Sequence, residues 1–298
     1  MSIDLGRGTS TGIPGALGGP NNIPLIELND GKQMPQLGFG VWQVSNEEVV
    51  PAVAAALEAG YRAVDTAQGY DNEEGVGQAI RESGIDRSEL FVTSKLRTKL
   101  LGHNEAIDGI RQSLDKLKLD YLDLFLIHWP CPALDRYVAA WSGLIEAQKQ
   151  GLVRSIGVSN FLPEHLERII SETGVVPVIN QIETHPEYQQ RQMQAVHDKY
   201  SIQHESYSPL GTGAVLDNEE IRRIADQHDK SEAQTIIRWH LQKGFVVIPK
   251  STHEERIREN LDVFDFELSE EDMQAIASLD RTPDGKTGGD PATFNDLY

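Results

Sequence analysis

Short, almost wholly apolar runs alternate along this chain with longer segments that place apolar residues on one helical face. Apolar runs of this length are typical of β-strands that are covered on both faces. The intervening segments mostly begin at a polar residue or a proline, as helices do. The pattern predicts about eight strands, at 36–40, 61–65, 90–95, 121–128, 153–159, 176–181, 202–207 and 245–249. Helices are predicted among others at 47–59, 104–119, 163–173 and 231–242, with one opening at Asn72, Glu73 and Glu74 and a final one at 268–280.

Strand and helix alternate about eight times, which favours a closed (β/α)₈ TIM barrel over a doubly wound sheet. The chain also lacks the G-x-G-x-x-G stretch of a dinucleotide-binding sheet. We expect a single barrel domain over 23–298, because no domain boundary is evident within it. Asn29-Asp30-Gly31 predicts a hairpin before the barrel, 1–22 is expected to be a flexible N-terminal tail, and 281–298 a short Gly- and Pro-containing C-terminal tail.

Composition excludes several classes of function. The formal net charge of -19 opposes binding to nucleic acid or to an anionic membrane, so a bound phosphate would need a local basic cluster. No apolar run has the length of a membrane span. The single cysteine, Cys131, excludes an internal disulfide and fits a reducing compartment, so we expect a cytoplasmic protein.

Three titratable residues close three successive predicted strands: Asp65, Lys95 and His128. Tyr70 follows in the loop after Asp65. In a barrel the carboxyl ends of the strands meet on one rim, where the catalytic groups of such folds lie. Taken singly, Asp65 is better explained as a turn residue, Lys95 as a solvated charge, and His128 as a core histidine. Their convergence on one rim, with a phenol above them, favours a catalytic site.

The motifs around these residues resemble those of the aldo-keto reductase family, over nearly the whole chain from about residue 23. They fall in the family's order: G-Y-R-A-V-D-T-A-x-x-Y-x-N-E-E-x-V-G at 60–77, L-I-H-W-P at 126–130, G-V-S-N-F at 157–161, N-Q-I-E at 180–183, and I-P-K-S at 248–251 with Arg256 and Asn260. In character the chain is closest to bacterial 2,5-diketo-D-gluconate reductase-like members, whose pockets are comparatively open.

This resemblance implies that Asp65, Tyr70, Lys95 and His128 form a catalytic tetrad. Reduction of a carbonyl leaves an alkoxide that must be protonated, and a free tyrosine is too weak an acid to do so readily. We expect Tyr70 to be the general acid, with Lys95 lowering its pKa and Asp65 keeping Lys95 charged. His128 would donate to the substrate carbonyl.

The resemblance also implies an NADPH site and no metal. Lys250 and Ser251 leave the last strand just before a predicted helix, where barrels hold phosphate. With Arg256 they are assigned to the 2′-phosphate. Ser159, Asn160 and Gln181 match the residues that hold the nicotinamide carboxamide, and Tyr207 matches the aromatic under its ring. The remaining matches are Ser208, Leu210 and Gly211 at the pyrophosphate, and Glu259 and Asn260 at the adenine.

The substrate is expected to be a small carbonyl compound, bound by a monomer. Trp42 and Trp129 lie beside the predicted rim and would form apolar walls. Arg97 stands where many relatives carry an aromatic residue. It either attracts a carboxylate on a keto acid or sugar acid, or it forms a rim salt bridge with a local Asp or Glu. His253 replaces the small residue usual near the 2′-phosphate.

Two other functions remain open on the sequence. Lys95 could attack a ketone as in a Schiff-base aldolase. Alternatively, the chain could be a redox-sensing auxiliary protein that binds NADPH with little turnover.

Overall fold

The computed structural model describes residues 17–298. The tail predicted for 1–22 therefore falls mostly outside the described residues. Eight parallel strands form one sheet in chain order from β3 to β10. Their bounds are β3 Phe39–Gly40, β4 Ala63–Asp65, β5 Phe91–Leu96, β6 Leu122–Ile127, β7 Val153–Ser159, β8 Ile179–Glu183, β9 Gln203–Tyr207 and β10 Val246–Val247.

The sheet closes between its first and last strands. Leu37 forms a parallel bridge with Val247, and the amide of Gly38 donates to the carbonyl of Val247 at 2.9 Å. Gly40 lies so close to the last strand that a Cβ there would stand 3.0 Å from the carbonyl oxygen of Ile248. The (β/α)₈ barrel predicted from the alternation of strand and helix is thus confirmed.

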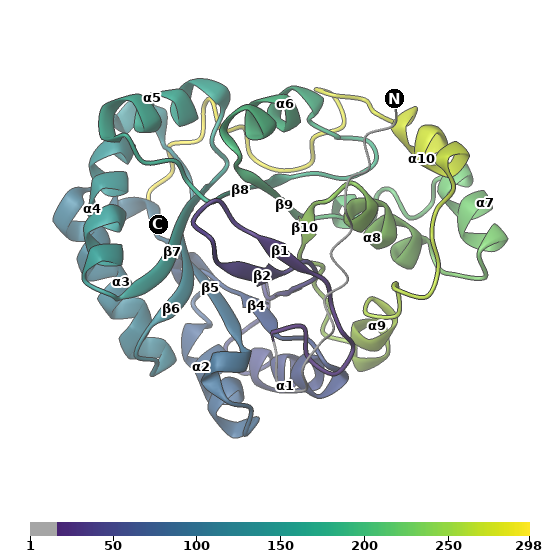
Figure 1. Cartoon of the computed structure of the whole chain (residues 1–298), viewed down its shortest axis with the longest axis horizontal. Coiled ribbons are helices and arrows are strands. Elements are labelled where there is room, and N and C mark those ends of the chain that lie inside the picture. Colours follow the sequence, from purple (N-terminus) through teal and green to yellow (C-terminus); the bar gives the residue numbers. More distant parts are fainter. Residues whose placement is uncertain (1–16) are drawn as a thin grey trace.

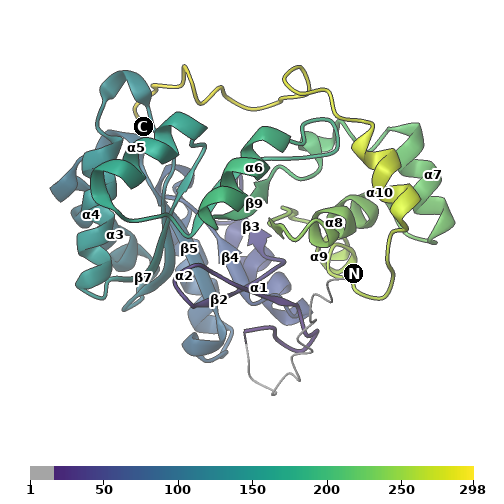
Figure 2. The same cartoon turned by 45° about the horizontal axis from the view of Figure 1, so that its top comes forward.

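Helices surround the barrel in the views of Figures 1 and 2. The helices are α1 Val49–Ala59, α2 Glu73–Glu82, α3 His103–Leu117, α4 Tyr137–Lys149, α5 Pro163–Thr173, α6 Arg191–Tyr200, α7 Glu219–Gln227, α8 Glu232–Gln242, α9 Glu254–Glu259 and α10 Glu270–Ala277. Local sequence features explain where two of these helices begin. α5 begins at a proline, and Ser231 caps α8 by accepting from the amide of Gln234.

The side chain of Asn72, the polar residue at which we expect this helix to open, makes no capping hydrogen bond to α2. Its side chain instead accepts from Thr66 Oγ1 at 2.7 Å and donates to the carbonyls of Val41 and Val44 at 3.0 and 2.9 Å. Asn72 is fully buried. Its amide is therefore engaged in joining the loop after β4 to the loop after β3, which holds the site loop in place.

The predicted hairpin is present, with β1 Leu25–Glu27 antiparallel to β2 Gln33–Pro35. It crosses in front of the barrel in Figure 1. Leu28 and Met34 of the hairpin pack with barrel residues such as Leu124 and Leu126 in one buried apolar cluster. The alternate residues Phe125 and Ile127 belong to the cluster beneath the helices. The hairpin thus closes one end of the barrel and leaves the other for a site.

Residues 281–298, which we call the C-terminal strap, follow α10 and run across the molecule toward α5, as the yellow trace in Figure 2 shows. They are held by loops that follow three different strands. Arg281 binds Glu187 after β8, Asn295 accepts from the amide of Ala133 after β6, and the amide of Tyr298 binds Thr98 after β5. The strap therefore lies against the loops at the carboxyl ends of these strands.

Candidate active site

A pocket of about 400 Å³ opens among the carboxyl ends of the strands. Eleven of the residues singled out by sequence line it. These are Trp42, Asp65, Tyr70, His128, Trp129, Ser159, Asn160, Gln181, Tyr207, Ser208 and Lys250. The strap supplies Thr287, Gly288, Gly289 and Tyr298 to the same lining.

Lys95 lies behind Asp65 and Tyr70 and has no exposure to solvent. Its ammonium donates to Asp65 Oδ1 at 2.5 Å, to the carbonyl of Thr66 at 2.9 Å and to Tyr70 Oη at 3.3 Å. Three acceptors match the three donors of an ammonium group. Burial acts to lower the pKa of Lys95, but the charge of Asp65 and the proximity of Tyr70 outweigh it, and the net pKa is raised. Lys95 is thus held as a cation.

The pKa of the Tyr70 phenol differs from our expectation. Burial raises its pKa above the ordinary value, and the charge of Lys95 offsets only part of that rise. The effect of Lys95 has the predicted sign, but desolvation of the phenolate is larger. The Tyr70 hydroxyl therefore keeps its proton in this structure.

His128 follows β6 and faces Tyr70 edge-on, with ring centroids 5.7 Å apart. Burial and the charge of Lys95 lower the pKa of His128 well below its ordinary value, so the imidazole is neutral. Its backbone carbonyl accepts from Asn160 Nδ2 at 3.0 Å. This contact ties His128 to the loop after β7.

Hydrogen bonds join Asp65 of the expected catalytic tetrad to the residues matched with a nicotinamide site. Gln181 donates to Asp65 Oδ2 at 2.9 Å, and Ser159 donates to the carbonyl of Gln181 at 2.8 Å. Tyr207 donates to Asn160 Oδ1 at 2.8 Å. Since these side chains come from the ends of β4, β7, β8 and β9, closure of the barrel is what brings them together.

The residues matched with the outer part of a cofactor extend away from this pocket. Ser251, Arg256, Glu259 and Asn260 lie on or beside α9, and Leu210 and Gly211 lie in the loop after β9; none of them lines the pocket. Glu259 accepts from the Ser231 hydroxyl, so its carboxylate already has a partner.

Lys250 and Arg256 fit an anionic ligand. Arg258 forms ion pairs with Glu254 and Glu58, whereas no carboxylate between residues 17 and 298 pairs with Lys250 or Arg256. In a chain with a formal net charge of -19, such cations are free to contact an anion from outside the protein.

Arg97 lies outside the pocket lining. Its guanidinium donates to the carbonyl of Gln68 at 2.5 Å and forms an ion pair with Asp71. The structure therefore favours the local salt bridge over the carboxylate-binding role. Trp42 and Trp129 do line the pocket, and Trp129 stacks on Phe294 of the strap with ring centroids 4.1 Å apart.

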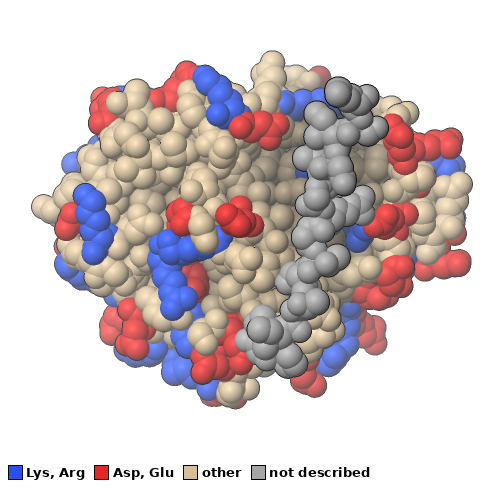
Figure 3. All heavy atoms as spheres, viewed as in Figure 1, with Lys and Arg blue, Asp and Glu red and all other residues tan. Residues whose placement is uncertain are grey.

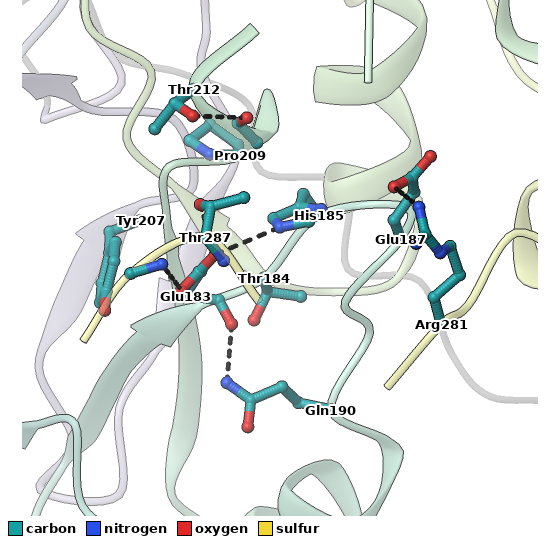
Figure 4. Close-up of polar contacts among 12 residues, drawn as sticks. Glu183, Thr184, His185, Glu187, Gln190, Tyr207, Pro209, Thr212, Arg281 and Thr287 are labelled. Atoms are coloured by element: carbon teal, nitrogen blue, oxygen red, sulfur yellow. Dashed lines mark hydrogen bonds and ion pairs between the residues drawn. The ribbon is translucent and has the colours of Figure 1, made fainter. Parts of the chain in front are cut away.

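Sequence reasoning missed the contribution of the strap. Glu183, at the end of β8, accepts from the amide and hydroxyl of Thr287, both at 2.7 Å, and from the amide of Gly288 at 2.9 Å (Figure 4). In Figure 4, Thr287 lies beside Glu183 and near His185. The only signal in the sequence was a pair of aromatic residues, Phe294 and Tyr298, in a tail of small residues.

Cys131 is buried, and burial raises the pKa of its thiol to about 11, so it is not an activated nucleophile. Between residues 17 and 298, no three or more His, Cys, Asp and Glu side chains are grouped so as to hold a metal ion.

None of the helices between residues 17 and 298 combines the length and hydropathy of a membrane span.

Comparison with known proteins shows what this arrangement resembles. Residues 36–281 match the model of the "Aldo/keto reductase family". The chain is 53% identical to "Methylglyoxal reductase DkgA" of Escherichia coli (strain K12), over 92% of this chain and 98% of that protein. It is 49% identical to "Aldo-keto reductase" of Mycobacterium sp. (strain KMS), over 91% of this chain and 98% of that protein.

Similar solved structures include complexes with NADPH or NADP. A mutant of Gox0644 in complex with NADPH is 49% identical, with a TM-score of 0.88, over 91% of this chain and 98% of that chain. The Bombyx mori aldo-keto reductase in complex with NADP is 38% identical, with a TM-score of 0.82, over 87% of this chain and 93% of that chain.

Proposed function

The chain belongs to the aldo/keto reductase family, and from this premise we propose that it is an NADPH-dependent oxidoreductase that reduces aldehydes or ketones to alcohols with Tyr70 as general acid. The observation that carries the proposal is the buried Asp65–Lys95–Tyr70 cluster beside His128. It lies in one pocket with Ser159, Asn160, Gln181 and Tyr207. Solved relatives of this fold are complexes with NADPH or NADP.

The residues present fit such a cofactor. Asn160 and Gln181 offer amide groups to a carboxamide, and Tyr207 offers an aromatic ring to the nicotinamide. Lys250 and Arg256 offer charge to a phosphate. When bound, NADPH would supply a hydride to the carbonyl carbon. The rest of the chemistry belongs to the side chains of the protein.

Tyr70 supplies the proton. An alkoxide is a much stronger base than a phenolate, so a Tyr70 hydroxyl that stays protonated until negative charge develops on the substrate oxygen can then transfer its proton. Lys95 stabilises the phenolate that is left, and Asp65 keeps Lys95 in place. His128 would donate a hydrogen bond that orients the carbonyl. We expect the protein to act as a monomer.

Lys95 is poorly suited to the aldolase alternative. A Schiff-base nucleophile must be a neutral amine, whereas the pKa of Lys95 is raised and its ammonium is bound to three acceptors.

The test is to follow the loss of NADPH absorbance with a panel of carbonyl compounds, including methylglyoxal, an aryl aldehyde, a keto acid and a sugar-derived ketone. We expect turnover with the wild type and none with Tyr70→Phe. Tight NADPH binding without reduction of any carbonyl would instead identify an auxiliary binding protein. Trapping of a substrate on Lys95 by borohydride, without nicotinamide, would identify an aldolase.

A further inference from the structure

The strap reaches His128 itself. Tyr298 Oη lies 2.8 Å from His128 Nδ1, and the two rings meet edge-on at 5.8 Å between centroids with an interplanar angle of 88°. Within residues 17–298, Tyr298 is the only hydrogen-bond partner of the His128 ring. The second ring nitrogen, Nε2, thus has no protein partner in that range.

Tyr298 is held firmly in this position. Its amide donates to Thr98 Oγ1 at 3.0 Å, and its carbonyl accepts from the amide of Lys99 at 3.4 Å. Its ring packs on Gly69, where an added Cβ would lie 2.4 Å from Tyr298 Cε2. Any larger residue at position 69 would displace the ring. The loop that carries Gly69 therefore packs closely against the strap at Tyr298.

Both groups are uncharged, so the hydrogen bond runs either from the phenol to Nδ1 or from an Nδ1–H to the phenol oxygen. His128 is neutral because burial and Lys95 lower its pKa. Burial, with Tyr70 nearby, raises the pKa of Tyr298, so its hydroxyl keeps its proton. A neutral imidazole carries one N–H, and the other nitrogen accepts. If the phenol donates to Nδ1, the imidazole proton must be on Nε2.

We propose that Tyr298 is a positioning residue that holds His128 as the Nε2–H tautomer, with its N–H available to the substrate carbonyl. The proposal rests on the proposed function, since it is the reduced carbonyl that receives this hydrogen bond. It gives the strap a role in the reaction in addition to covering the pocket. The opposite tautomer would present a lone pair to the carbonyl oxygen and repel it.

The test combines ¹⁵N NMR of histidine-labelled protein with steady-state kinetics of Tyr298→Phe, which keeps the ring and removes the hydroxyl. In the wild type we expect His128 Nδ1 to have the shift of an unprotonated, hydrogen-bonded nitrogen and Nε2 that of a protonated one. In Tyr298→Phe the two tautomers should mix, and kcat/KM should fall about 3- to 10-fold, the range for one neutral hydrogen bond. The Kd of NADPH and the thermal midpoint should not change. Tyr200→Phe, which removes a remote hydroxyl bound to Glu167, is the matched control.

A wild-type spectrum with the proton on Nδ1, or a Tyr298→Phe variant unchanged in both tautomer and kcat/KM, overturns the proposal. A loss of activity with a lowered thermal midpoint and an unchanged tautomer also overturns it, because the role is then structural. Failure of the proposed function is distinguishable. In that case the wild type reduces no carbonyl, while the tautomer of His128 is still read by NMR.

Discussion

At the scale of single residues, the site depends on a cation that has no access to water. Lys95 remains charged because Asp65 Oδ1, the carbonyl of Thr66 and Tyr70 Oη accept from its three donors. Asp65 is in turn held by Gln181. A buried charge that loses its partner is costly, so substitutions in this cluster should reduce the activity to different extents.

Tyr70→Phe should abolish carbonyl reduction and leave the Kd of NADPH within a small factor of the wild type. The hydroxyl is needed when the alkoxide forms and contributes little before that. Lys95→Met should also remove most activity, and Asp65→Asn should be milder because the carboxylate acts through Lys95. Steady-state rates and fluorescence titration with NADPH provide the measurements. If Tyr70→Phe retains most of the activity, Tyr70 is not the acid.

Arg97→Ala should not discriminate between charged and neutral substrates. Arg97 lies outside the pocket lining and binds Asp71 and the carbonyl of Gln68. We expect kcat/KM to change by the same factor for a keto acid and for a neutral aldehyde of similar size. A loss confined to the keto acid would restore the carboxylate-binding role to Arg97.

At the scale of elements, the carboxylate of Glu183 joins the end of β8 to the strap beside the pocket. Burial alone raises the pKa of Glu183, but hydrogen bonds from His185, Thr287 and Gly288 outweigh it, and the net pKa is lowered. A lowered folded-state pKa contributes stability that is present above the unfolded pKa and lost as the pH falls through the folded pKa. This contact between β8 and the strap should therefore hold at neutral pH and weaken in acid.

Glu183→Gln should loosen the strap and speed NADPH dissociation by on the order of 10-fold, because hydrogen bonds to a charged acceptor are lost. Stopped-flow fluorescence measures this rate. The control is Glu187→Gln, which removes a more exposed ion pair to Arg281 at 3.1 Å on the same strap. An exposed pair contributes little, so this rate should stay close to that of the wild type. Equal rates in all three proteins would show that the Glu183 contact does not limit release.

Buried histidines link α6 to the barrel strands and should make the fold sensitive to acid. His197 Nδ1 lies 3.2 Å from His204 Nδ1, and Asn180 and Thr184 bind the outer ends of the pair. Burial lowers the pKa of His204 well below its ordinary value, and His197, His240 and Lys243 lower it further. Burial lowers the pKa of His197 to about 4.

A lowered folded-state pKa means that the unfolded chain takes up protons first as the pH falls. The stabilisation is full above the unfolded histidine pKa of about 6.5 and is lost progressively from there toward pH 4. His197→Gln should flatten the dependence of the unfolding free energy on pH in this window. Urea unfolding at several pH values measures the slope, with the exposed His103→Gln as control. An unchanged slope in His197→Gln would contradict the assignment.

At the scale of the whole molecule, Lys250 and Arg256 act against a large negative net charge. On the face drawn in Figure 3, Lys and Arg side chains are interspersed with Asp and Glu. The formal net charge is -19. Under the proposed function, Lys250 and Arg256 attract phosphate at short range against a repulsive background, which makes the interaction sensitive to ionic strength.

Arg256→Ala should weaken NADPH on the order of 10- to 100-fold and leave NADH nearly unchanged, since only NADPH carries the 2′-phosphate. The affinity of the wild type for NADPH should also fall as salt rises. Arg258→Ala is the matched control, because Arg258 already pairs with Glu254 and Glu58. Dissociation constants for both cofactors at low and high salt test this. Equal losses for NADPH and NADH would show that Arg256 does not recognise the 2′-phosphate.

The sequence by itself determined the barrel and the rim. The spacing of apolar residues is a local property, so strands such as β7 and helices such as α5 were predicted at their observed bounds. Asp65, Lys95 and His128 were predicted to meet because the carboxyl ends of parallel strands in a closed barrel share one rim, whatever the details of packing.

Only the tertiary structure decided how that rim is completed. Tyr298 contacts His128 across 170 residues and Thr287 contacts Glu183 across 104, and no periodic pattern in the strap signals either contact. The pairing of Arg97 with Asp71 and the rise in the pKa of Tyr70 likewise depend on burial and on neighbours from other elements. Periodicity reports which face of an element is apolar. Hydrogen-bond partners and desolvation are set by distances between segments that the folded chain alone defines.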